Sequence, residues 1–73
     1  MLLSQSKVGT RYRVVSLSMA EDSKRRFEIL GLIPGSTVTV INYKRNGARI
    51  IRLRGTRYAI GPAFSRSVEL EEL

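Results

Sequence analysis

The sequence predicts a small, mainly β domain that contains one helix. Turn-forming residues recur at short intervals, among them Pro34-Gly35 and Asn46-Gly47, and β-rich runs lie between them. This pattern is typical of a small barrel or sandwich. The length of 73 residues allows one domain, which we expect to span residues 1–73. We expect five strands, at Arg11 to Leu17, Ser36 to Tyr43, Ala48 to Arg54, Arg57 to Ile60 and Ser67 to Leu70.

The segment from Ser18 to Leu30 interrupts the strand pattern, because it lacks alternation and contains no Gly or Pro. Ser18 and Glu21 have the spacing of a capping box, in which each side chain accepts a hydrogen bond from a free backbone N–H at the helix start. Gly31 is the natural left-handed residue of a Schellman ending. Opposite charges four residues apart predict three ion pairs along this helix: Glu21–Arg25, Asp22–Arg26 and Lys24–Glu28.

The third and fourth strands are expected to form a hairpin with Gly55-Thr56 as its two-residue loop. This loop would place Leu53 opposite Tyr58, both facing the core. It would also place Arg54 directly opposite Arg57 on the outer face. Like charges in such a pair destabilise a sheet unless another group neutralises them.

The composition argues against an enzyme. The chain has no Cys and no His, which removes thiol and imidazole catalysis and the usual N and S ligands of transition metals. The six Asp and Glu fall on the helix surface or at the acidic end of the chain, and the glycines form no phosphate-binding loop. We therefore expect no catalytic, cofactor-binding or metal-binding residues.

Positive charge is the strongest functional signal. Thirteen Lys and Arg against six Asp and Glu give a net charge of +7, and ten of the thirteen are Arg, which pairs readily with carboxylates and phosphates. Four arginines are candidate partner-binding residues: Arg25, Arg26, Arg54 and Arg57. Two plainer interpretations stay open. The arginines could form a solvated face, or they could pair within the molecule, either along the helix or with the acidic C-terminal strand.

The segment from Arg25 to Gly35 resembles the small ferrous iron transport protein A (FeoA) family, through its basic helix end, its apolar-Gly-apolar junction and its Pro34-Gly35 before a Val/Thr-rich strand. Further matches extend the resemblance over essentially the full chain: Leu3-Ser4, Val8-Gly9, Gly55, Tyr58-Ala59-Ile60 and Ala63. The resemblance implies an SH3-like barrel of about five strands with a helix between the first two. A related barrel occurs in iron-dependent repressors, which also carry a helix-turn-helix module that this chain lacks.

The resemblance further implies a cytosolic accessory role in ferrous iron uptake, together with a large membrane permease (FeoB) that carries a cytosolic G-protein domain. Our first hypothesis is a non-enzymatic, cytoplasmic adaptor that binds the cytosolic part of this permease and reaches the membrane only through it. No apolar run spans a bilayer, and the start of the chain does not resemble a signal peptide. We expect no cofactor and no small-molecule substrate.

The alternative hypothesis is a small basic barrel that binds nucleic acid. Its support is the net charge of +7, and it would use exposed tyrosines for base stacking, with Tyr12, Tyr43 and Tyr58 as candidates. Tyr58 is assigned to the core face, however, and the C-terminal end is acidic. Salt separates the two hypotheses, because binding that neutralises several phosphates weakens steeply as salt increases.

Overall fold

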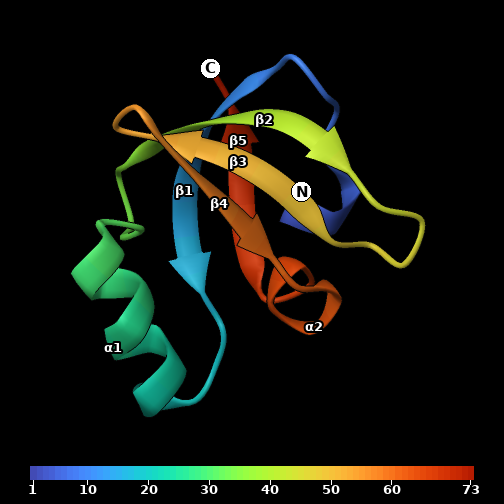
Figure 1. Ribbon diagram of the computed structural model, residues 1–73. Coiled ribbons are helices and arrows are strands. Elements are labelled where there is room, and N and C mark those ends of the chain that lie inside the picture. The colour runs from blue at the N-terminus through green and yellow to red at the C-terminus, as the bar shows by residue number, and fades with distance from the viewer.

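The computed structural model describes residues 1–73 and contains the five expected strands and the expected helix (Figure 1). The strand ends lie within two residues of their predicted positions. A short helix between the fourth and fifth strands was not predicted. In chain order the elements are η1 (Leu3–Gln5), β1 (Arg11–Leu17), α1 (Glu21–Leu30), β2 (Thr37–Tyr43), β3 (Arg49–Leu53), β4 (Thr56–Ile60), α2 (Pro62–Ser65) and β5 (Val68–Glu72).

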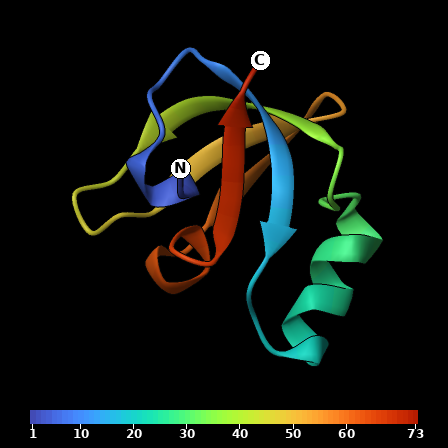
Figure 2. The same cartoon turned by 180° about the vertical axis from the view of Figure 1, so that it is seen from behind.

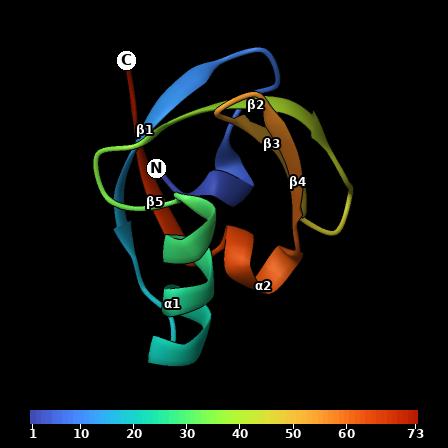
Figure 3. The same ribbon diagram turned by 60° about the vertical axis from the view of Figure 1, so that its left-hand side comes forward.

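The strands form one antiparallel sheet in the order β4-β3-β2-β1-β5. The sheet curls strongly, so that β4 and β5, its two outer strands, lie on opposite sides of the interior (Figure 3). Bulges between Val14 and Ser16 in β1 and between Val40 and Asn42 in β2 assist this bending, since an extra residue bends and twists its strand. Both α1 and α2 lie at the same end of the resulting barrel.

The interior of the barrel is a single apolar cluster to which every strand contributes. Alternate residues of each strand point inward, as the period of two requires. Phe27, Met19 and Tyr58 pack against the edge of this core and are only partly buried. Its twelve buried members are Leu3, Tyr12, Val14, Leu17, Leu32, Val38, Val40, Ile51, Leu53, Ile60, Val68 and Leu70.

The register predicted for the β3–β4 hairpin is wrong by two residues. Leu53 pairs with Thr56, and Arg52, not Arg54, stands opposite Arg57. The loop is Arg54-Gly55, whose φ values of 53° and 81° are those of a type I′ turn, the form that matches strand twist. Because the shift is even, each side chain keeps its predicted face. Arg54 and Arg57 therefore remain outside, but they do not form the predicted cross-strand pair.

The predicted capping box at the start of α1 does not form. The helix begins at Glu21, after Ala20, and no side chain caps it. The backbone N–H of Ser18, which a capping box would pair with Glu21, donates instead to the carbonyl of Ser67 (2.8 Å), and this bond extends the pairing of β1 with β5. The three ion pairs expected along α1 are also absent.

The other end of α1 follows the prediction. Gly31 is left-handed, with φ of 94°, and ends the helix. The N–H of Gly31 donates to the carbonyl of Glu28 (3.0 Å), and the N–H of Leu32 donates to that of Phe27 (2.9 Å). These two bonds define a Schellman ending, which turns the chain sharply and inserts Leu32 into the core.

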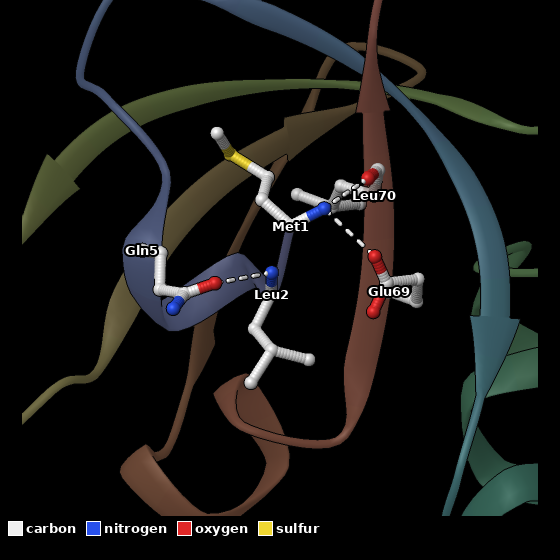
Figure 4. A network of polar contacts seen from close by, with 5 residues as sticks. All are labelled: Met1, Leu2, Gln5, Glu69 and Leu70. Carbon is white, nitrogen blue, oxygen red and sulfur yellow. Dashed lines mark hydrogen bonds and ion pairs between the residues drawn. The ribbon is translucent and has the colours of Figure 1, made fainter.

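The N-terminal segment closes one side of the barrel beside β5 (Figures 2 and 4). The α-amine of Met1 donates to Glu69 Oε2 (2.7 Å) and to the carbonyl of Leu70 (2.8 Å). The N–H of Leu2 donates to Gln5 Oε1 (2.8 Å), which holds the following turn. Leu2 also forms an isolated antiparallel bridge with Glu69, so this segment covers part of the β5 edge.

Arg49 ties the same N-terminal segment to β3 from inside the fold. Its side chain is largely buried, with 9% exposed, and it donates to the carbonyls of Ser4 (2.6 Å) and Ala48 (3.2 Å). The guanidinium also lies 5.5 Å from the centre of the Tyr43 ring. Arg49 thus satisfies backbone acceptors and has a structural role.

Candidate functional site

The four candidate arginines lie in two places, on the surface of α1 and on the β3–β4 hairpin. All four are exposed: Arg25, Arg26, Arg54 and Arg57. None of them forms an ion pair. The salt bridges of the molecule join Glu69 to the amine of Met1 and Glu71 to Arg13. Internal pairing of these arginines with the acidic C-terminal strand is therefore not seen.

Arg54 brings the hairpin into contact with the end of α1. Its guanidinium packs over Gly31, so closely that a Cβ at Gly31 would lie 3.4 Å from Cζ and Nη1 of Arg54. The tip of the hairpin therefore reaches the turn that follows α1 (Figure 1). This contact places the positive charge of Arg54 beside the C-terminal end of α1, where it interacts favourably with the helix dipole.

A hollow, which we call the α1–α2 groove, lies between the two helices. Its volume is about 170 Å³, and it is lined by Ser23, Arg26, Phe27, Leu30 and Phe64. The rings of Phe27 and Phe64 meet edge to face, with centres 5.2 Å apart and planes at 81°. The groove thus combines apolar walls with one guanidinium, and it joins residues from two helices that lie side by side (Figure 3).

Of the four candidate arginines, only Arg26 lines this groove. Arg25 is one position from Arg26, about 100° around the helix, and does not line the groove. Arg57 faces Arg52 across the β3–β4 hairpin, which places two like charges directly opposite each other. The structure therefore places Arg26 in the groove and Arg54 against the turn that follows α1, while Arg25 and Arg57 lie elsewhere on the surface.

Sequence reasoning missed the apolar part of this surface. Phe64 belongs to α2, a single helical turn that begins at Pro62 and was not predicted from the sequence. Phe64 and Leu30, which both line the groove, keep 37% and 38% of their surface exposed. Exposed apolar residues that gather in one place mark interaction sites, and this clustering depends on the tertiary fold.

The three tyrosines do not form a platform for base stacking. Tyr12 is fully buried, and its hydroxyl accepts a hydrogen bond from the N–H of Lys7 (2.9 Å). Tyr58 is partly buried against the core. Tyr43, the last residue of β2, is exposed at 58%. A single exposed ring gives weak support to nucleic-acid binding.

Two further observations concern metals and membranes. No three His, Cys, Asp or Glu residues come together in an arrangement that could hold a metal ion. No helix combines the length and apolar character that crossing a bilayer requires.

Comparison with known proteins places the chain in a family. The family model of the FeoA domain matches residues 1–72. The chain belongs to the FeoA domain family. This membership confirms the resemblance carried by the segment from Arg25 to Gly35, and it implies an accessory role in ferrous iron transport. No curated protein matches the sequence significantly.

Solved structures support the same assignment. A crystal structure of the iron uptake regulatory protein FeoA matches all of this chain and 97% of its own, with 29% identity and a TM-score of 0.90. The zinc complex of FeoA from Stenotrophomonas maltophilia, a prokaryotic SH3 domain protein, matches over 97% of this chain and 89% of its own, with 25% identity and a TM-score of 0.81. The predicted SH3-like barrel is thus confirmed.

The same barrel occurs in a different class of protein. A manganese-dependent transcriptional repressor matches all of this chain with 16% identity and a TM-score of 0.89, but the match covers 41% of the repressor. At that identity the likeness concerns the fold alone. The function of this FeoA-family chain has to be argued from its own surface.

Proposed function

We propose that this protein is a non-enzymatic accessory factor of ferrous iron uptake, which binds the cytosolic, G-protein-containing part of a ferrous iron permease and supports its activity. Family membership supports the transport role. The FeoA of S. maltophilia has itself been proposed as a ferrous iron transport activating factor. The observation that carries the proposal is an apolar groove lined by Arg26, together with three further exposed arginines that form no ion pair: Arg25, Arg54 and Arg57.

The physical basis is that these arginines give up no internal ion pair when they bind. A guanidinium offers several N–H donors and forms bidentate hydrogen bonds with a carboxylate. SH3-like barrels of this size act through their surfaces, and the inventory of side chains offers no acid–base or nucleophilic pair. In this proposal residues 1–73 act as one domain in the cytoplasm. The domain reaches the membrane through the permease and requires no cofactor or small-molecule substrate.

The test is an amide-resolved NMR titration of the labelled protein with the cytosolic domain of the permease from the same organism, with affinity measured by calorimetry. We expect saturable shifts at the end of α1 and at the β3–β4 turn. The double variant Arg26→Ala/Arg54→Ala should lose about ten-fold or more in affinity, which corresponds to about 1.4 kcal/mol. The matched control Arg11→Ala/Arg45→Ala removes two exposed arginines elsewhere and should change affinity little.

Failure of the wild-type protein to bind this domain would overturn the proposal. The second candidate function, binding of nucleic acid, rests on the net charge of +7. It predicts that affinity for a nucleic-acid oligomer exceeds that for the permease domain and falls steeply between about 50 and 200 mM salt. Binding at an apolar groove would fall less over the same range, because apolar contacts are not screened.

A further inference from the structure

The α1–α2 groove has the size and chemistry of a pocket for one side chain. Its walls are the apolar surfaces of Phe27, Leu30 and Phe64, and its volume is about 170 Å³. For comparison, an apolar cavity of about 150 Å³ admits a benzene molecule. The groove therefore has room for one leucine or phenylalanine side chain.

The charge beside the groove indicates what must accompany that side chain. Arg26 lines the groove and has no ion-pair partner. Glu28 points about 200° away from Arg26 around the helix, and Asp22, which lies one turn before Arg26 on the same face, forms no ion pair with it. A carboxylate next to the inserted side chain would thus meet a guanidinium that has no ion-pair partner in the structure.

We infer that the α1–α2 groove anchors one bulky apolar side chain of the partner, which is followed or preceded by an acidic residue that pairs with Arg26. The inference rests on the proposed function and specifies how the partner is recognised. A protein segment fits better than nucleic acid, since most of the groove wall is apolar surface, which a hydrophobic side chain can cover and a phosphate cannot. A second copy of this chain fits less well, because two molecules of net charge +7 repel each other.

The anchor makes Leu30 and Ile29 a matched pair of test positions. Both are apolar residues in the last turn of α1, but Leu30 lines the groove and Ile29, at 80% exposure, points away from it. We expect Leu30→Ser to weaken binding to the permease cytosolic domain by about ten-fold or more, because the apolar contact between Leu30 and the inserted side chain is lost. Ile29→Ser should leave the affinity within about two-fold of wild type, which is under 0.5 kcal/mol.

A second variant tests the groove itself. Ser23 lies at its wall, so Ser23→Trp should fill it and prevent insertion of the partner's side chain, while the fold stays intact by thermal unfolding. Equal affinities of the Leu30→Ser and Ile29→Ser variants, together with full binding by Ser23→Trp, would overturn the inference and leave the proposed function standing.

A small-molecule probe distinguishes a groove that does not bind an apolar side chain from a protein that does not bind the permease domain. N-acetyl-L-leucine carries an isobutyl group beside a carboxylate, and N-acetyl-L-leucinamide is the same molecule without the charge. In NMR titrations at millimolar concentration, the acid should shift the resonances of Phe27, Leu30 and Phe64 more than the amide does, and Ser23→Trp should abolish the shifts. This result would support the groove even if the permease domain did not bind. Absence of saturable shifts from both compounds, with binding of the domain unaffected by Leu30→Ser, would refute the anchor.

Discussion

Replacing Arg54 with Asn is expected to stabilise the fold and weaken partner binding at the same time. Arg54 is the one non-glycine residue with a positive φ, 53°, and it precedes Gly55 in the type I′ turn between β3 and β4. A left-handed conformation costs an ordinary L-residue about 1–2 kcal/mol, because Cβ approaches the following carbonyl oxygen. Asn tolerates this region, and Asn-Gly is the preferred pair in such turns.

The net gain follows from two opposing contributions. Relief of the left-handed strain contributes about 1 kcal/mol. The exposed contact of the Arg54 guanidinium with Gly31 is lost, and this costs a few tenths of a kcal/mol, as for other exposed interactions. We therefore expect Arg54→Asn to raise the free energy of unfolding by about 0.5–1 kcal/mol. For a domain of this size, that corresponds to an increase in Tm of about 2–8 °C.

Thermal and urea unfolding of the two proteins measure this change, and calorimetry with the permease domain measures binding. Arg11→Asn is the matched control, since it makes the same chemical change within strand β1, where Thr39 and not a like charge stands opposite. It should not increase stability, because Asn is unfavourable in strands. A lower Tm for Arg54→Asn than for wild type would refute the strain argument. Increased stability with unchanged affinity would instead refute the role of Arg54 in binding.

Three other substitutions test further parts of the structure. Gly31→Ala should lower the free energy of unfolding by about 1–2 kcal/mol in urea, because φ is 94° there; an unchanged midpoint would contradict this. Arg49→Met leaves the carbonyl of Ser4 without its donor, so we expect the free energy of unfolding to fall by about 1–3 kcal/mol and amide exchange in η1 to become faster. Exchange in η1 at the wild-type rate would argue against a stabilising role of this hydrogen bond. Arg57→Glu places a negative charge directly opposite Arg52 and should stabilise the fold by about 0.2–1 kcal/mol. This stabilisation should shrink at about 1 M salt, and a salt-independent gain would point to another cause.

Much of the fold could be predicted from local sequence patterns. Alternation and turn residues located all five strands, since side-chain period and turn conformation depend on neighbouring residues. The end of α1 was predicted correctly because Gly31 and Leu32 carry their own local signal. The family resemblance likewise lay in consecutive residues, those before and after Pro34-Gly35.

The predictions that failed depended on contacts between distant segments. Ser18 is of a residue type that commonly caps helices, but its N–H pairs with the carbonyl of Ser67, and the helix begins only at Glu21. The Gly55-Thr56 loop was chemically plausible, and strand twist selected Arg54-Gly55 instead.

The candidate site likewise has one part that the sequence could predict and one part that it could not. Composition and charge alone indicated exposed arginines, and the sequence was sufficient to name Arg26 and Arg54 as candidates. Only the tertiary structure brought Phe64 of α2 against Phe27 of α1 and so created the groove beside Arg26. These residues are far apart in the chain, and a contact between them leaves no periodic trace in the sequence, because it is determined by how the barrel closes.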